Sequence, residues 1–312
     1  MFKRTCLSAS LILAASATPA WAHSPTVISS VKPLALMQAD MGLGHQEAIV
    51  PEGVTPHDFT LRASQMKRIK EADLVIWLGP DVEPALAKIM AGKAADEQII
   101  LPVYGTAMDM QAEAHDHHEH EEHEEHEEEH AGEEVHDDHG HEGHDHADLH
   151  PWTSPKYMLQ AIATVHHELE ERDFHLSAAQ EQQIEALEHA LDEQLHEMQE
   201  EWHEQAPAYF IFHDALGPFE ADMGIEAKGS LADSAGATKG AKTLVELKHM
   251  VHEGEVKCIL IDDEANLALV DKLAGDELAK VEVDILAWRQ PVAENNLLTY
   301  FDNMQAALRQ CR

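Results

Sequence analysis

The sequence predicts an α/β protein of two Rossmann-like lobes, each a mostly parallel sheet flanked by helices, joined by one long rigid helix. Short apolar and β-branched runs alternate with helical segments in the first third of the chain, and the same alternation restarts in the last third. Between them lies one long stretch of amphipathic helical periodicity. We therefore expect an N-terminal lobe at 23–153, helices at 154–206 and a C-terminal lobe at 207–312.

The N-terminal lobe contains a clear buried-strand signal. LVIWLG, at residues 74–79, is a continuous apolar run ended by Gly-Pro, which is typical of a parallel strand covered on both faces. Shorter apolar runs and helical stretches surround it. The expected strands are 26–30, 47–51, 74–79 and 98–103, and the expected helices are 63–71 and 82–91.

Residues 112–148 interrupt this alternation. They are largely histidine and acid with no hydrophobic periodicity, so burial cannot offset their ordering entropy and we expect them to be disordered. A helix should follow over 154–172. A second, over 177–204, begins with Ser177 and Gln180 at capping-box spacing and then has apolar residues at steps of three and four. This linker helix should be about 40 Å long, enough to span a small domain.

The C-terminal lobe repeats the strand–helix alternation. The expected strands are 209–213, 256–262 and 280–286, and the expected helices are 243–252, 266–273 and 295–309. Ligands of paired α/β lobes bind between the lobes, at the carboxyl ends of strands. Functional side chains are therefore expected where these strands end.

The N-terminus of the chain has the features of a cleaved export signal. Lys3 and Arg4 precede an apolar run, and Ala20-Trp21-Ala22 places small residues where a signal peptidase cleaves, so residues 1–22 should be a signal peptide. No later run approaches the length of a membrane span. The net charge of −38 argues against nucleic acid and anionic membrane as partners and suits a cationic ligand.

The mature chain would hold two cysteines, Cys258 and Cys311. In an exported protein such a pair most often forms a disulfide, which here would close a loop worth on the order of 4 kcal/mol. Two free thiols and a pair of metal ligands are the alternatives.

Three histidines lie where a site between the lobes is expected. His57 is in the loop after the second expected strand, His150 directly precedes a helix, and His213 ends the first strand of the C-terminal lobe. Three imidazoles with an oxygen ligand would suit tetrahedral Zn²⁺. None lies in a local metal motif, and the chain has 25 histidines, so ordinary loop histidines are the alternative. Asp284 lies near the end of a later strand.

Several long segments resemble the metal-binding solute receptors of ABC importers, in particular the zinc-binding periplasmic receptors of high-affinity zinc transporters. These segments are VISSVKPLALM, PHDFTLRASQMKRIKEADLVIWLGPDVE, DLHPWTSPKYM and YFIFHDALGPFE, and the acidic histidine-rich insertion fits as well. The resemblance covers nearly all of the mature chain. It implies two α/β lobes on a rigid helix, a periplasmic location, no enzymatic step, and an ABC permease and its ATPase as partners of a monomeric receptor.

The resemblance also implies which residues bind the metal. The family's three histidine ligands fall on His57, His150 and His213, and a histidine at the third position favours zinc over manganese. The family's acidic fourth ligand would fall on Asp284. The surrounding VEVDILAWRQ lacks a glycine that relatives often have, so water is the alternative fourth ligand.

The acidic run suggests an accessory role in metal capture. Its imidazoles are largely neutral near pH 7 and would bind metal weakly and with little selectivity close to His150. A solvated spacer without a role in uptake is the alternative. The histidines of the run are His115, His117, His118, His120, His123, His126, His130, His136, His139, His141, His144 and His146.

The sequence therefore predicts a periplasmic receptor that captures Zn²⁺ between two lobes and delivers it to a permease. A receptor of the same fold for Mn²⁺, Ni²⁺ or Cu²⁺, a secreted metal store or chaperone, and a zinc hydrolase are the alternatives. The hydrolase would need a general base beside a metal-bound water. Asp58 and Asp214 each directly follow a candidate ligand and so should point away from it.

Overall fold

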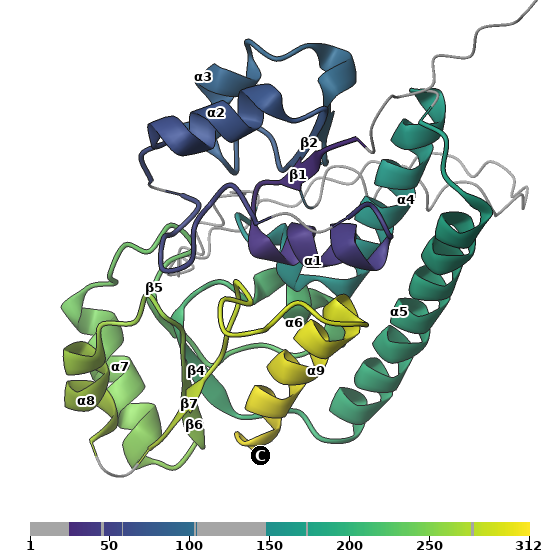
Figure 1. Ribbon diagram of the computed structural model, residues 1–312. Coiled ribbons are helices and arrows are strands. Elements are labelled where there is room, and N and C mark those ends of the chain that lie inside the picture. Colours follow the sequence, from purple (N-terminus) through teal and green to yellow (C-terminus); the bar gives the residue numbers. More distant parts are fainter. Residues whose placement is uncertain are drawn as a thin grey trace, which may run out of the picture.

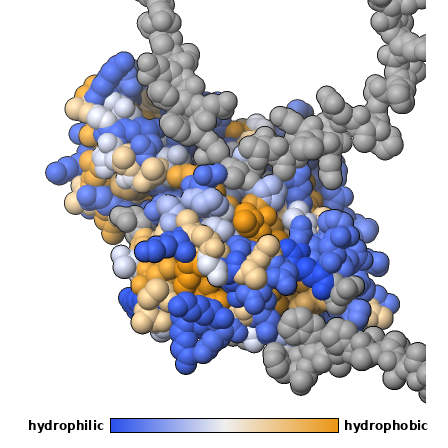
Figure 2. All heavy atoms as spheres, turned by 90° about the horizontal axis from the view of Figure 1, so that it is seen from above, coloured by the Kyte–Doolittle hydropathy of each residue, from blue (hydrophilic) through white to orange (hydrophobic). Residues whose placement is uncertain are grey.

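The computed structural model describes residues 25–44, 47–57, 59–102, 104, 148–172, 174–275 and 278–312 (Figure 1). The predicted signal peptide and nearly all of the acidic run lie outside these ranges. No helix in the described ranges is long and apolar enough to cross a membrane. Figure 2 shows hydrophilic residues interspersed with apolar ones on the face seen from above.

The N-terminal lobe is built on a three-stranded parallel sheet in the order β1-β2-β3. Its strands are β1 (Val27–Ser29), β2 (Leu74–Trp77) and β3 (Gln98–Ile100). Its helices are α1 (Lys32–Asp40), α2 (Ala63–Glu71), α3 (Pro84–Met90) and the short 3-10 turn η1 (Ala95–Glu97).

Two features of this lobe differ from expectation. The segment 47–51 is not a strand, although the amides of Ile49 and Val50 donate to the carbonyls of Ser29 and Ser30. Consecutive amides point to opposite sides of a regular strand, so this is not a ladder pattern, and Pro51 has no amide to extend it. Helix α1 was not expected because it is buried almost all round and therefore shows no amphipathic period.

A helical hairpin joins the lobes. After the 3-10 turn η3 (Pro151–Thr153), α4 (Pro155–Glu171) packs against α5 (Ala178–Glu204), the long helix expected from the sequence. The predicted capping box is present: Ser177 accepts from the Gln180 amide while the Gln180 side chain accepts from the Ser177 amide. The buried face of α5 is the expected apolar stripe, formed by Ile184, Leu187, Leu191, Leu195, Met198 and Trp202.

The C-terminal lobe is a four-stranded parallel sheet in the order β5-β4-β6-β7. Its strands are β4 (Tyr209–His213), β5 (Ser230–Ala232), β6 (Cys258–Ile261) and β7 (Ala279–Glu282). Its helices are α6 (Gly217–Met223), α7 (Ala241–His252), α8 (Leu267–Ala274) and α9 (Asn296–Arg309). The short elements α6 and β5 were not expected. Two parallel sheets flanked by helices confirm the predicted fold class.

The two lobes share one continuous hydrophobic core. Helix α5 contacts α1 of the N-terminal lobe and both α6 and α9 of the C-terminal lobe, and α1 packs directly on α9 (Figure 1). At that contact the buried carboxylate of Asp40 accepts hydrogen bonds from the amides of Asn296 and Leu297 and from the Asn296 side chain. Asp40 therefore caps the first turn of a helix in the other lobe.

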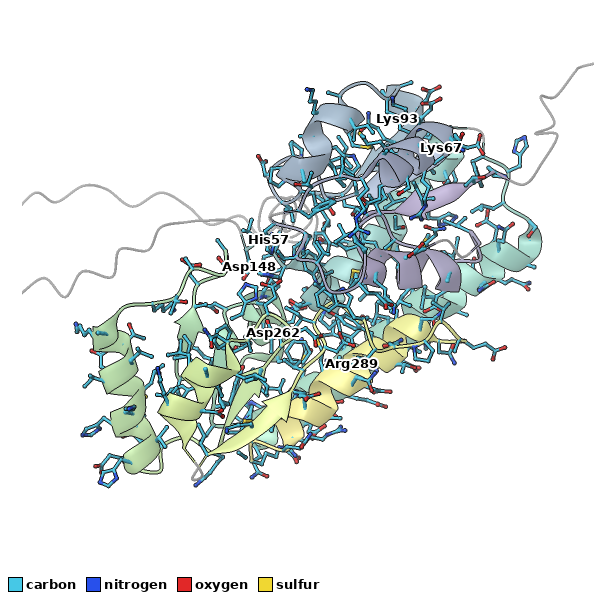
Figure 3. The ribbon with its side chains drawn as sticks, turned by 60° about the vertical axis from the view of Figure 1, so that its left-hand side comes forward. His57, Lys67, Lys93, Asp148, Asp262 and Arg289 are labelled. Carbon is cyan, nitrogen blue, oxygen red and sulfur yellow. A yellow bond between two sulfur atoms is a disulfide. The ribbon has the colours of Figure 1, made fainter. Side chains whose placement is uncertain are left out.

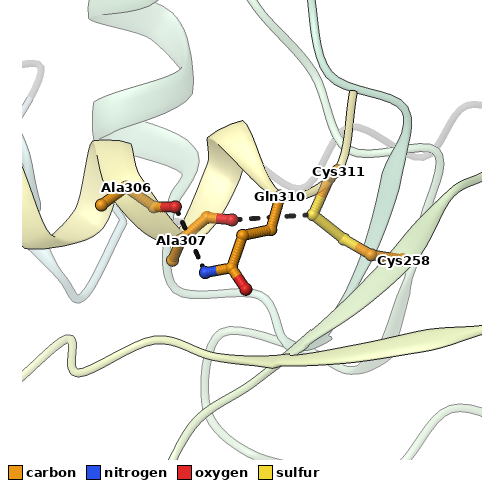
Figure 4. The surroundings of a disulfide bond; sticks show 5 residues. All are labelled: Cys258, Ala306, Ala307, Gln310 and Cys311. Carbon is orange, nitrogen blue, oxygen red and sulfur yellow. Dashed lines mark hydrogen bonds between the residues drawn. A yellow bond between two sulfur atoms is a disulfide. The ribbon is translucent and has the colours of Figure 1, made fainter.

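The predicted disulfide is present between Cys258 and Cys311 (Figure 4). The two Cα atoms lie 5.1 Å apart, and both side chains are fully buried. The bond ties β6, in the centre of the sheet, to the chain just after α9. The terminal helix is thereby fixed against the lobe.

Candidate metal site

The three predicted histidines lie together between the lobes. His57 is in the loop before α2, His150 directly precedes η3, and His213 is the last residue of β4. The ring centroids of His57 and His150 lie 4.8 Å apart, and those of His150 and His213 also lie 4.8 Å apart. Figure 3 shows His57 and the acids Asp148 and Asp262 at the junction of the two lobes.

His57 and His150 present nitrogens to one another. Their Nε2 atoms are 3.0 Å apart and their rings are nearly perpendicular, at 85°. The Nδ1 atom of His150 lies 3.2 Å from Oδ1 of Asp148, which also accepts the His150 amide at 2.9 Å. An ionised carboxylate can only accept, so Nδ1 carries the proton and the Nε2 of His150 presents its lone pair.

Burial keeps these two imidazoles neutral. It lowers the pKa of His57 to about 3, and the nearby rings of His150 and His213 act in the same direction. It also lowers the pKa of His150, against the opposing effect of its hydrogen bond to Asp148. Neutral imidazole is the form that binds metal, so both rings are ready to act as ligands near pH 7.

The indole ring of Trp152 lies against both of these imidazoles. Its ring stacks near that of His57, at 22° and a centroid distance of 6.4 Å, and meets the ring of His150 edge-on at 5.3 Å. It is completely buried, and its indole nitrogen donates to the carbonyl of Ile285 in the C-terminal lobe. Trp152 thus connects both rings to the opposite side of the site.

His213 is held by oxygen atoms of its own lobe. Its Nδ1 lies 3.1 Å from Oδ2 of Asp262 and 3.7 Å from Oε2 of Glu264, and its Nε2 lies 3.2 Å from the carbonyl of Ser234. Burial alone would lower the pKa of His213, but the hydrogen bond and charge of Asp262 outweigh it and the pKa is raised. Both ring nitrogens therefore have protein acceptors. In this arrangement the described histidines, cysteines and acids include no group of three oriented to hold a metal ion.

The carboxylates around the three rings were missed by sequence reasoning. Asp148 lies two residues before His150, at the end of the acidic run, where it was counted as part of that run. Asp262 and Glu264 follow β6, and β6 is the neighbour of β4 in the sheet. The signal was therefore present: the acids in IDDE follow a buried strand, at the sheet edge where β4 ends in His213.

Asp284, the predicted fourth ligand, makes other contacts. Its Oδ1 accepts a hydrogen bond of 2.8 Å from the amide of Trp288, and its Oδ2 accepts one of 2.8 Å from the amide of Arg289. The Arg289 side chain is also close, with Nε 3.9 Å from Oδ2. The carboxylate thus stabilises the turn that follows β7.

The remaining predicted residues are the histidines of the acidic run and the two proposed general bases, Asp58 and Asp214. The histidines of the acidic run lie outside the described residues, as does Asp58. Asp214, the other proposed general base, accepts a hydrogen bond of 3.2 Å from the hydroxyl of Ser230 and has Nζ of Lys239 at 3.7 Å. Its carboxylate is therefore engaged within its own lobe.

Comparison with known proteins identifies the family. A family model described as ZnuA, zinc-uptake complex component A, periplasmic, matches residues 27–312. The chain is 29% identical over 285 residues to the high-affinity zinc uptake system protein ZnuA of Yersinia pestis, covering 87% of this chain and 85% of that protein. It is 31% identical over 287 residues to the protein of the same name from Haemophilus ducreyi, covering 90% and 89%.

The fold agrees with a solved structure. A crystal structure of ZnuA matches with a TM-score of 0.66 at 17% identity, over 92% of this chain and 97% of that one. The predicted resemblance is thus confirmed, and with it the expectation of a transport component that is not an enzyme. The chain belongs to the ZnuA family, the periplasmic binding components of zinc-uptake ABC transporters.

Proposed function

We propose that this protein captures Zn²⁺ between its two lobes through His57, His150 and His213 and delivers the ion to an ABC permease and its ATPase. The observation that carries the proposal is the meeting of three buried or half-buried imidazoles from separate parts of the chain, with 4.8 Å between successive ring centroids. One comes from the N-terminal lobe, one from the segment before η3, and one from the C-terminal lobe.

The distance between the first two ligands supports zinc. Zinc–nitrogen bonds of 2.0–2.1 Å at tetrahedral angles place two ligand nitrogens about 3.3 Å apart. The Nε2 atoms of His57 and His150 lie 3.0 Å apart, so a small outward movement would admit the ion. Both rings are neutral and desolvated, which suits a borderline-soft divalent cation.

Carboxylates hydrogen-bonded to two of the rings support the same assignment. Asp148 accepts from Nδ1 of His150, and Asp262 accepts from Nδ1 of His213. In metal sites, a carboxylate at one imidazole nitrogen fixes the ring and makes the other nitrogen a better donor. In each case zinc would bind Nε2, which at His213 is bonded to the carbonyl of Ser234.

Binding would require one local change at His213. Its Nε2 lies 3.2 Å from the carbonyl of Ser234, which belongs to the loop between β5 and α7. Zinc would take the place of the proton on Nε2, which would be released to solvent, so that a coordinate bond replaces this hydrogen bond while the bond to Asp262 remains. Loading is therefore proposed to involve this loop and the His213 ring, with little movement between lobes that share a core.

The histidine-rich run is proposed to be an accessory capture element. Its ligands are His115, His117, His118, His120, His123, His126, His130, His136, His139, His141, His144 and His146. The run ends at Asp148, two residues before His150, so a weakly bound ion would be released close to the proposed site. The unselective sites of the run would capture the metal first, and the selective site between the lobes would then bind it tightly.

A competition titration tests the proposal. Wild type should bind one Zn²⁺ tightly in preference to Mn²⁺ and Ni²⁺, and His57→Ala, His150→Ala and His213→Ala should each abolish tight binding. The matched control is His196→Ala, on the exposed face of α5, which should bind zinc like wild type. A tight site that survives all three substitutions would exclude this location. Binding of many zinc ions with equal affinity would indicate a metal store. Tighter binding of another metal would identify that metal as the cargo.

A further inference from the structure

The three imidazoles leave one position of a tetrahedral zinc ion to be filled. A zinc ion bound by three protein nitrogens takes an oxygen there, from water or from an Asp or Glu carboxylate. Among the described residues, the carboxylates that contact these rings and whose charges raise the ring pKa values are Asp148, Asp262 and Glu264. The position of the fourth ligand can therefore be argued from which of these carboxylates has a free oxygen.

Three acids have oxygens that already accept hydrogen bonds. Both oxygens of Asp284 accept backbone amides at 2.8 Å. Asp262 accepts from the His213 ring through Oδ2 and from the Glu264 amide through Oδ1, at 3.1 Å each. Asp148 holds the amide and Nδ1 of His150 through Oδ1, and a β-carbon at Gly217 would lie 2.5 Å from its Oδ2, so it is closely confined. Asp284 and Asp262 would each have to give up a hydrogen bond to bind a metal, and Asp148 is held by its bonds to His150 with its second oxygen packed against Gly217.

Glu264 is placed differently. Its Oε2 lies 3.7 Å from Nδ1 of His213, and its charge acts on both His213 and His150. Neither of its carboxylate oxygens accepts a hydrogen bond within the described part of the chain. Its backbone is fixed by the bond from its amide to Asp262, while its side chain is 24% exposed.

The space next to Glu264 would allow its side chain to turn toward the metal. The side chain faces Gly236, where an added β-carbon would lie 3.9 Å from Oε2, and Gly236 belongs to the same loop as Ser234. The Ser234 carbonyl is the group that zinc would displace from His213. Rotation about glutamate side-chain torsions can carry the carboxylate several ångströms without backbone movement.

From these contacts we propose that Glu264, rather than Asp284 or water, supplies the fourth and anionic ligand of the zinc ion. The inference rests on the three-histidine site proposed above. It makes the ligand set three neutral nitrogens and one carboxylate, which offsets part of the ion's charge in a buried site. It also assigns Asp262 a positioning role, because Asp262 orients both the His213 ring and the backbone of Glu264.

Substitutions at the two competing acids test the proposal on the full chain. Glu264→Gln should weaken zinc binding at least about tenfold in a chelator competition titration. Asp284→Asn should leave zinc affinity unchanged, as should the control Glu282→Gln, an exposed glutamate at the end of β7. If Glu264→Gln binds like wild type, or if Asp284→Asn alone weakens binding, the assignment is overturned.

Cobalt substitution separates direct coordination from an effect through His213. The visible absorption of Co²⁺-loaded Glu264→Ala should differ from that of wild type, and added acetate should restore it by replacing the missing carboxylate. Weakened binding with an unchanged cobalt spectrum and no response to acetate would make Glu264 a positioning residue and refute the ligand role. Failure of the histidine site itself would be visible separately, because His57→Ala and His150→Ala would then keep tight zinc.

Discussion

Glu83 should make the stability of the metal-free protein depend on pH. It is completely buried where α3 begins, and its Oε2 accepts a hydrogen bond of 2.7 Å from the amide of Leu78, directly after β2. Burial raises the pKa of Glu83 from 4.5 to about 7, against the opposing effects of Ser30 and the Leu78 amide. This acid therefore holds its proton in the folded state under conditions where an exposed glutamate is ionised.

The sign of the effect follows from proton binding. Below about pH 4.5 both states hold the proton, and between about 4.5 and 7 only the folded state does. The contribution of Glu83 is therefore fully present at low pH and is lost as the pH rises through about 7. The rise in the pKa from 4.5 to about 7, at 1.36 kcal/mol per pH unit, corresponds to about 3 kcal/mol in total.

Glu83→Gln isolates this contribution, because glutamine does not ionise and keeps an acceptor for the Leu78 amide. Urea unfolding with a chelator present should show that the variant gains roughly 2 to 3 kcal/mol relative to wild type between pH 5 and pH 8, because most of the loss falls in this interval. Comparing the two proteins at each pH cancels the other titrating groups. Glu200→Gln, on the exposed face of α5, should show no such change. A difference between Glu83→Gln and wild type that is the same at both pH values would refute the reasoning.

Three further perturbations have defined outcomes. Replacing Cys258 and Cys311 by alanine opens a loop with a sequence separation of 53. Urea unfolding should then show a free energy of unfolding lowered by about 4 kcal/mol. A loss below about 1 kcal/mol would contradict this. Asp40→Ala should cost roughly 3 kcal/mol by calorimetry, because buried amides at the start of α9 lose their acceptor, and Asp40→Asn should cost less; equal losses would refute the cap. Deleting 115–146 should remove weak zinc sites and keep one tight site in titration calorimetry, and loss of the tight site would make the run essential.

Long periodic or continuous apolar segments were predictable from the sequence. The α2 helix and the β4 strand were predicted at their observed bounds from helical composition and a strand-like apolar run, and α5 within one residue from its helical periodicity. Short elements were not predictable in this way. β5 has three residues and forms because β4 offers it an open edge, and α6 is a single pair of turns placed by packing against α5.

The candidate metal site was likewise predictable only in part. The three histidines could be named because His150 and His213 lie at element ends, His57 lies in a loop expected at the same edge, and the family's ligand positions fall on all three. The acids behind them could not, because their roles depend on which strands are neighbours and on where single side chains point. Asp284 and Glu264 both follow strands of the same sheet, and periodicity cannot distinguish a carboxylate whose two oxygens each accept an amide from one whose oxygens accept no hydrogen bond among the described residues.

The most direct test of the account is a count of imidazole ligands on the bound ion. X-ray absorption at the zinc edge should be recorded on the protein lacking 115–146 and loaded with one equivalent of zinc, so that the run contributes nothing. The account predicts three imidazoles with nitrogens at about 2.0–2.1 Å and one oxygen, with one imidazole fewer in each of His57→Ala, His150→Ala and His213→Ala where zinc is still held. An ion with fewer than three imidazoles, or a spectrum unchanged by these substitutions, would contradict it.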